Sequence, residues 1–174
     1  MTMSARHHRF DALVGALLPD LYRYAYWLCR DRALAEDVVQ ETLLRAWRSL
    51  ESLRDDKAAK PWLITILRRE LARTYERVRP ELVDVADLPL AEERAEDAGE
   101  RAVDAALLRR AMQGLEPEYR EPLVLQVLLG QTVEEIAAVM ELNPATVLTR
   151  LFRARKKLAA ALDRPLQPLT AEGA

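Results

Sequence analysis

The chain has few of the residues on which enzyme sites, metal sites and disulfide frameworks depend. Cys29 is its one cysteine, which excludes an internal disulfide and indicates a reducing compartment. Its two histidines, His7 and His8, are adjacent near the start, so we expect neither a histidine-based catalytic triad nor a metal cluster. The five glycines are scattered singly, which excludes a glycine-rich phosphate loop. The sequence therefore predicts a protein that is not an enzyme and uses no metal or cofactor.

Long apolar runs are also missing. No run approaches the roughly 20 residues that cross a bilayer, and no apolar segment follows the basic N-terminus, so we expect neither a signal peptide nor insertion into a membrane. Half of the residues are hydrophobic and 31% are charged, which is typical of a folded, soluble chain. Because glycine is scarce and alanine, leucine, arginine and glutamate are abundant, we expect an all-α protein in the cytoplasm.

The net charge of −2 is distributed unevenly. Residues 1–80 carry 15 basic and 11 acidic side chains, residues 81–104 carry 2 and 9, and residues 105–174 carry 9 and 8. An acidic segment thus separates two blocks, and the positive charge of the second block is concentrated in one stretch. This pattern predicts two binding modules joined by an acidic linker.

The clearest local pattern lies at residues 132–158, TVEEIAAVMELNPATVLTRLFRARKKL. Thr132 and Glu135, three residues apart, form a capping box that begins one helix. Asn143 followed by Pro144 begins a second helix, because asparagine caps well and proline costs little at the first helical position. The pattern predicts a helix-turn-helix.

The second of these helices has two different faces. Its apolar face consists of Val147, Leu151, Ala154 and Leu158. Its other face consists of Thr146, Thr149, Arg150, Arg153 and Lys157. Residues 144–162 include five basic side chains and no acidic one, whereas a solvated helix normally carries both signs. We therefore expect this helix to enter a DNA groove.

Three helices are expected before the linker, at about 10–29, 32–53 and 61–79. The inward face of the second, which Asp31 can cap, consists of Val39, Leu43, Ala46, Trp47 and Leu50. The opposite face consists of Asp37, Gln40, Glu41, Leu44 and Arg48. This row is either a solvated face with charge pairs or, because it includes the apolar Leu44, a docking surface for a partner helix.

The third helix has an inward face at Leu63, Ile64, Leu67, Leu71 and Tyr75. Its other face carries Trp62, Ile66, Arg69 and Arg73, with Arg68 nearby. An aromatic ring beside arginines suits single-stranded nucleic acid, since bases stack on rings and phosphates pair with guanidinium groups. The alternative is that Trp62 and Ile66 are core residues.

Prolines and the loss of the apolar repeat mark the boundaries of the remaining segments. Residues 81–104 are expected to be a linker, followed by a short helix from about Ala105. Another helix begins near 116–117, and we expect a kink or a restart near Glu121, because Pro122 removes a helical hydrogen bond. A disordered tail is expected beyond Leu162.

Three segments of the chain resemble the extracytoplasmic-function (ECF) group of bacterial sigma factors, which belongs to the sigma-70 family. They are LAEDVVQETLLRAWRSL at 34–50, PWLITILRRELAR at 61–73 and LEPEYREPLVLQVLLGQTVEEIAAVMELNPATVLTRLFRARKKL at 115–158. The resemblance implies a transcription initiation factor that binds RNA polymerase core and directs it to promoters by reading their −35 and −10 elements, in a stress or envelope response.

The same resemblance implies a division of the chain. Sigma region 2 is expected at 1–80 and sigma region 4 at 105–162, as two small helical domains held apart by a flexible acidic linker at 81–104. A tail follows at 163–174. The implied partners are RNA polymerase core, promoter DNA and an anti-sigma factor.

Residue roles follow from the resemblance by position. The β′ clamp helices of the polymerase are expected to bind Asp37, Gln40, Glu41 and Leu44. The −10 element is expected to meet Lys60, Trp62, Arg68, Arg69 and Arg73. The −35 element is expected to meet Thr146, Thr149, Arg150, Phe152 and Arg153, with Lys156 and Lys157 on phosphates. Region 4 is also expected to contact the β flap.

Three positions depart from the family pattern. Arg69 replaces an asparagine that usually follows the tryptophan by seven residues, and Leu148 stands where a basic residue is common. Glu141 stands where the turn often has glycine, and a left-handed conformation there carries a strain of roughly 1 kcal/mol. These positions bear on which promoter sequence is recognised.

Two alternatives explain less of the chain. A stand-alone helix-turn-helix regulator, with an N-terminal dimerisation or sensor domain, leaves the segments at 34–50 and 61–73 unexplained. A helical scaffold or anti-sigma-type interaction protein that mimics an acidic partner would not place five cations and no anion on one helix.

Overall fold

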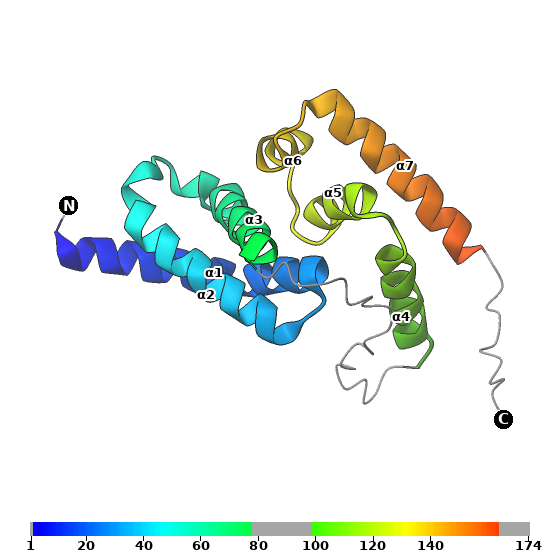
Figure 1. Cartoon of the computed structure of the whole chain (residues 1–174), viewed down its shortest axis with the longest axis horizontal. Helices are drawn as coiled ribbons and strands as arrows, with labels where there is room; N and C mark the ends of the chain where they lie inside the picture. Colours follow the sequence, from blue (N-terminus) through cyan, green and yellow to red (C-terminus); the bar gives the residue numbers. More distant parts are fainter. Residues whose placement is uncertain (1, 78–98, 164–174) are drawn as a thin grey trace.

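The computed structural model describes residues 2–77 and 99–163, and every regular element in these two ranges is helical. The prediction of an all-α fold is confirmed. The predicted tail and most of the predicted linker lie outside the described residues. The described residues form seven α-helices and two short 3₁₀ turns (Figure 1): α1 (Met3–Cys29), α2 (Arg32–Ser49), η1 (Leu50–Ser52), η2 (Asp56–Ala58), α3 (Ala59–Arg77), α4 (Gly99–Gln113), α5 (Pro117–Val127), α6 (Val133–Met140) and α7 (Pro144–Leu162).

Side-chain caps begin several of these helices at the expected residues. Asp31 accepts a hydrogen bond from the Leu34 amide at the start of α2, and the Thr132–Glu135 capping box is complete at the start of α6. Helix α1 begins at Met3, seven residues earlier than the apolar stripe predicts. Its extra turns are held by Trp47, whose carbonyl accepts a 2.7 Å bond from Arg6 and whose ring lies 4.6 Å from the ring of His7, tilted by 45°.

Helices α1, α2 and α3 form the first group around a shared core. In α3, Leu63, Ile64, Leu67 and Leu71 are buried as predicted, but the prediction for Tyr75 is wrong because its side chain is exposed. Burial in α3 ends at Leu71, so Tyr75 lies beyond the core. Glu70 is buried instead, because its carboxylate receives Arg45 of α2 and Arg73, each at 2.6 Å.

Helices α4 to α7 form the second group. Helix α4 begins at Gly99, six residues before the expected start. Helix α5 runs without interruption through Pro122, so the helix does not restart near Glu121. The alternative of a kink there stays a prediction. The missing amide costs one helical hydrogen bond, and the proline ring is buried in the core of this group, which offsets that cost.

The turn between α6 and α7 adopts the strained conformation expected of it. Glu141 has φ 57° and ψ 43°, the left-handed region, and its amide donates to the carbonyl of Ala137 to end α6. Asn143 then caps α7, with its side chain accepting a 2.8 Å bond from the Thr146 amide. This turn sets the direction in which α7 leaves α6.

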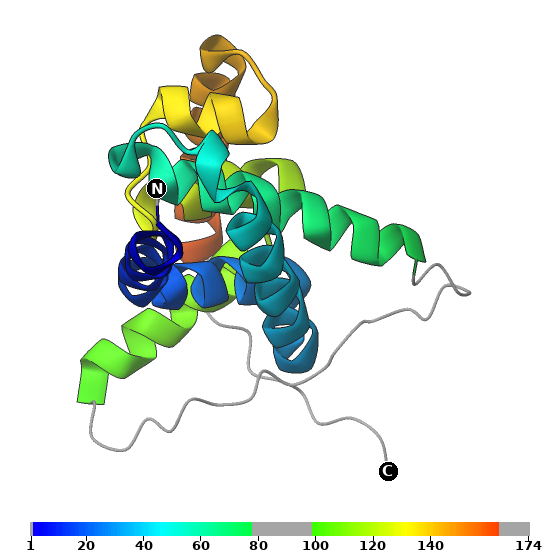
Figure 2. The ribbon, with the colours of Figure 1, turned by 90° about the vertical axis from the view of Figure 1, so that its left-hand side faces the viewer.

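The two groups are in contact, and their buried residues form one continuous cluster. Helix α3 packs against α6, and α1 packs against α5, in an arrangement that can be followed in both views (Figures 1 and 2). The resemblance implies two domains held apart by a linker. In this structure they touch, because polar and apolar side chains of both groups meet across the boundary.

Candidate nucleic-acid and partner interfaces

The first candidate interface is the outer face of α7. Its inner face is anchored by Val147, Leu151 and Ala154, which are buried as predicted. Because these three side chains fix the rotation of the helix, the opposite face must point to solvent. The side chains predicted to contact the −35 element all lie on α7, where five are exposed and Thr146 and Arg150 are half-buried: Thr146, Thr149, Arg150, Phe152, Arg153, Lys156 and Lys157.

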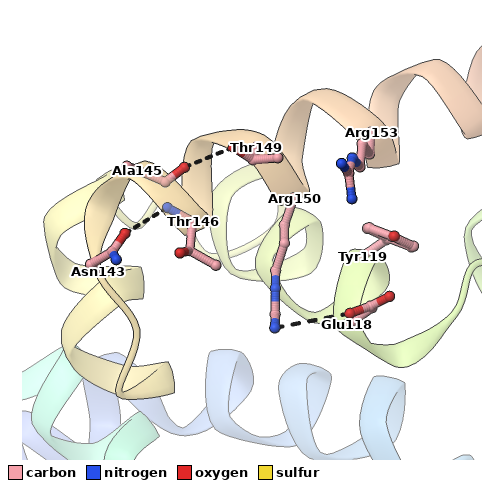
Figure 3. A pocket seen from close by; sticks show the side chains of 8 residues that line it. All are labelled: Glu118, Tyr119, Asn143, Ala145, Thr146, Thr149, Arg150 and Arg153. Carbon is pink, nitrogen blue, oxygen red and sulfur yellow. Dashed lines mark hydrogen bonds and ion pairs between the residues drawn. The ribbon is translucent and has the colours of Figure 1, made fainter.

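A cleft of about 400 Å³ lies between the start of α5 and this outer face (Figure 3). Tyr119 and Glu118 of α5 form one wall, and Arg153 and Arg150 of α7 form the other. Arg150 extends down to Glu118, with 3.9 Å between guanidinium nitrogen and carboxylate oxygen (Figure 3). The Thr149 hydroxyl donates to the carbonyl of Ala145 at 3.0 Å.

Helix α5 and its N-cap residue, Glu116, hold other cations of α7 as well. Lys157 donates to Glu116 at 2.7 Å and lies over the ring of Tyr119. That hydrogen bond lowers the pKa of Glu116 and raises the pKa of Lys157. Arg155 bonds the amide oxygen of Gln126.

Arg153 and Lys156 differ from these three cations. Neither makes an ion pair or a side-chain hydrogen bond within ranges 2–77 and 99–163, and both are exposed. The helix therefore presents two cations that are free to meet an anion, together with three whose positions are set by α5. The sequence pattern alone does not separate these two sets.

The second candidate interface is the basic face of α3, and carboxylates already occupy it. Lys60 pairs with Asp20 at 2.6 Å, and Arg73 pairs with Glu70. Arg69 pairs with Glu141 at 3.3 Å, a contact that reaches the second group of helices.

Trp62 and Ile66 are not on an exposed ridge of this face. Both are half-buried and pack against the hydrophobic core, in agreement with the alternative that they are core residues. An aromatic ring in this position stabilises α3 against its neighbours by burying apolar surface. Stacking of a base on Trp62 would require part of that packing to open.

Arg68 is the predicted −10 residue that reaches α5. Its Nε donates to Glu121 of α5 at 2.7 Å, and the hydroxyl of Tyr24 in α1 donates to the same carboxylate oxygen at 2.7 Å. Burial opposes the charge on Arg68, but the hydrogen bond and charge of Glu121 raise its pKa overall. Burial, together with Glu121, raises the pKa of Tyr24 well above its ordinary value.

Sequence reasoning missed the role of Glu121 at this junction. One signal pointed to it: Glu121 is a carboxylate directly before PLVL, a run of four residues that are all buried. A charged group at the edge of such a run needs a partner, because a charge near apolar surroundings is costly when unpaired. The identity of that partner, however, depends on helices far away in the sequence.

The third candidate interface is the outer face of α2. Asp37, Gln40 and Leu44 are exposed, and Glu41 is half-buried beside Arg45 at 3.3 Å. These four side chains lie opposite the buried stripe of α2, so the structure brings them together on one surface.

None of the helices in the described ranges is long and apolar enough to cross a membrane.

Comparisons with known proteins agree with this arrangement. Residues 13–81 match the family model for sigma-70 region 2, and residues 105–158 match the model for sigma-70 region 4. The ECF RNA polymerase sigma factor EcfG of Rhodopseudomonas palustris is 34% identical over 148 residues, which cover 84% of this chain and 81% of that protein. The ECF sigma factor SigL of Mycobacterium tuberculosis is 34% identical over 159 residues, which cover 87% and 90% respectively.

Two solved structures have a similar fold. One is the sigma factor RpoE of Bartonella quintana in complex with the anti-sigma factor NepR, with 30% identity, a TM-score of 0.70, and coverage of 90% of this chain and 99% of that chain. The other is CnrH in complex with the cytosolic domain of CnrY, with 28% identity, a TM-score of 0.66, and coverage of 90% and 89%. Both similarities extend over the two groups of helices.

Proposed function

Because the chain belongs to the ECF sigma factors of the sigma-70 family, which direct RNA polymerase to promoters, we propose a division of that activity among its helices. Helix α7 reads the −35 element, α3 reads the −10 element, and the outer face of α2 binds the polymerase core. The observation that carries this proposal is the outer face of α7. It has two cations without an acidic partner among the described residues, and no acidic residue lies between Pro144 and Leu162.

Helix α7 supports the −35 assignment by its charge and its anchoring. In this proposal Arg153 bonds a guanine edge and Lys156 neutralises a phosphate. Arg150 and Lys157 pair with Glu118 and Glu116, so they contribute less to DNA binding than the two cations without such partners.

Assigning the −10 element to α3 requires a change in the ion pairs of this helix. Arg68 and Arg69 are paired with Glu121 and Glu141 of the second group of helices. Both arginines must leave these carboxylates before they can contact promoter DNA. The proposal therefore requires the two groups to separate when the protein binds polymerase and promoter.

Helix α2 supports the polymerase assignment through Leu44, an exposed apolar side chain bordered by Asp37, Gln40 and Glu41. An apolar centre with a polar rim is the usual composition of a protein interface. We assign this surface to the β′ clamp helices and expect the second group to contact the β flap. An anti-sigma factor is a further proposed partner, and the site of action is the cytoplasm.

The test is a pull-down of purified core RNA polymerase with the tagged full-length chain, followed by run-off transcription from promoters selected in vitro. We expect a stable complex and initiation that depends on the chain. Leu44→Asp is expected to abolish both, while Arg48→Ala, at the edge of the same face, leaves them intact. Binding of the chain to duplex DNA without any binding to core polymerase would overturn the proposal in favour of a stand-alone regulator.

A further inference from the structure

Two large apolar side chains on α7 are more than half exposed. Leu148 is 56% exposed and Phe152 is 69% exposed. They are four residues apart, so they lie side by side on the solvent-facing side of one helix. The core beneath α7 is already filled by Val147, Leu151 and Ala154. We call this pair the apolar ridge.

The surroundings of the apolar ridge are cationic. Arg153 follows Phe152 directly, and Lys156 lies one turn further along, both without a carboxylate partner in the described part of the chain. The two carboxylates that pair with side chains of α7 are Glu116, which bonds Lys157, and Glu118, which lies 3.9 Å from Arg150. An apolar surface bordered by free cations and no free anion matches a polyanion that also displays apolar groups.

Double-stranded DNA has that combination in one place. Only its major groove displays an apolar group, the C5 methyl of thymine, between two rows of phosphates. Leu148 and Phe152 are in the second and third turns of α7, in the half of a recognition helix that contacts base edges. Four helical residues rise about 6 Å, close to two base-pair steps at about 3.4 Å each.

We propose that Leu148 and Phe152 recognise two thymine methyl groups, about two base-pair steps apart, in the upstream promoter element. This inference rests on the proposed function of α7. It adds Leu148 as a contact residue and the thymine methyl as the group that is recognised. Arg153 and Lys156 hold the helix in the groove, and the ridge distinguishes thymine from cytosine, which has no methyl group at C5.

The test uses the full-length chain with core polymerase to select duplexes from a random library. Each thymine of the selected upstream element is then replaced, one at a time, by deoxyuridine, which keeps its base pairing and lacks only the methyl. We expect two positions at which this replacement weakens binding by about three- to fivefold, the loss of one buried methyl-sized group. Leu148→Ala is expected to remove the effect at one position and Phe152→Ala at the other.

Two further variants serve as controls. Val127→Ala removes another exposed apolar side chain, 60% exposed on α5, and is expected to keep both methyl effects. Leu148→Met keeps an apolar side chain of similar size and is expected to keep them too. Because all these positions are exposed or conservatively changed, thermal unfolding of the variants should match that of the wild-type chain.

The outcomes separate this inference from the function on which it rests. If no duplex is selected, the proposed function fails. A selected element without thymine, or one whose deoxyuridine series binds as tightly as the original, overturns the ridge proposal alone. Loss of polymerase binding in Leu148→Ala, with DNA binding unchanged, would also overturn it, since the ridge would then be a docking surface for protein.

Discussion

The five cations of α7 differ in what holds them. Arg150, Arg155 and Lys157 are engaged by side chains of α5, whereas Arg153 and Lys156 have no such partner among the described residues. A cation that must leave a carboxylate gives up part of what it gains on DNA. The net contribution of each basic residue therefore depends on its neighbours more than on its charge.

Arg153→Ala is expected to weaken binding to a selected duplex by about 1–3 kcal/mol, with a smaller loss on random duplex, because a base contact is removed. Equilibrium binding at a fixed salt concentration measures both. Arg155→Ala is the matched control: it removes an equal charge from the same helix and should weaken both duplexes alike. Equal losses on both duplexes for Arg153→Ala would show that it contacts only phosphates.

Ionisation of Tyr24 is expected to lower the stability of the protein at alkaline pH. Its pKa is raised in the folded state, so its hydroxyl stabilises the fold fully below the unfolded value of about 10 and loses this contribution as pH rises above it. The free energy of unfolding of wild type minus that of Tyr24→Phe should be constant from pH 7 to 9 and fall above pH 10. Urea denaturation across this range checks it, and a flat difference would contradict it.

At the scale of elements, the turn between α6 and α7 combines a good cap with a strained residue. Thr132 and Asn143 stabilise the two helix starts, while Glu141 occupies a left-handed conformation that favours glycine. The ion pair between Glu141 and Arg69 offsets part of this strain. Both side chains are largely exposed, however, and exposed ion pairs contribute little to stability.

Glu141→Gly is expected to raise the free energy of unfolding by roughly 1 kcal/mol, since the left-handed strain exceeds the value of an exposed ion pair. Chemical denaturation measures the change. Glu134→Gly, at an exposed position inside α6, is the opposite control and should lower stability by about 1 kcal/mol. A loss of stability in Glu141→Gly would mean that the pair with Arg69 outweighs the strain.

At the scale of the whole molecule, one carboxylate joins three helices of two groups. Glu121 of α5 accepts from Tyr24 of α1 and from Arg68 of α3. In the same arrangement Arg68 and Arg69, which are proposed to meet the −10 element, pair with Glu121 and Glu141 of the second group. Contact between the groups therefore competes with promoter binding by α3.

Glu121→Gln is expected to shift the protein toward separated groups, because it leaves the Arg68 cation without its counter-charge. Arg68 keeps 35% of its side chain exposed, so the shift is about 1–2 kcal/mol, below that of a fully buried pair. Small-angle scattering should show a larger radius of gyration. Glu118→Gln, on the same helix but with only a 3.9 Å contact, should leave it unchanged; equal expansion of both variants would contradict the role of Glu121.

The features that the sequence by itself determined are those that depend on residues close together along the chain. The capping box at Thr132, the Asn143–Pro144 helix start and the inward face of α7 were all predictable, because each depends on residues within a few positions of one another. The class of fold and the family followed from such segments taken together. The left-handed turn at Glu141 was expected from the resemblance, because the family often has glycine at that position.

Only the tertiary structure decided which side chains are free and which are held. Glu121 meets Tyr24 and Arg68 across 97 and 53 residues, and no local pattern encodes those distances. The uninterrupted course of α5 through Pro122, the burial of Trp62 and the exposure of Tyr75 likewise depend on what packs against each residue. Periodicity predicts which side of a helix is apolar, but the neighbouring helix determines how much of that side is covered.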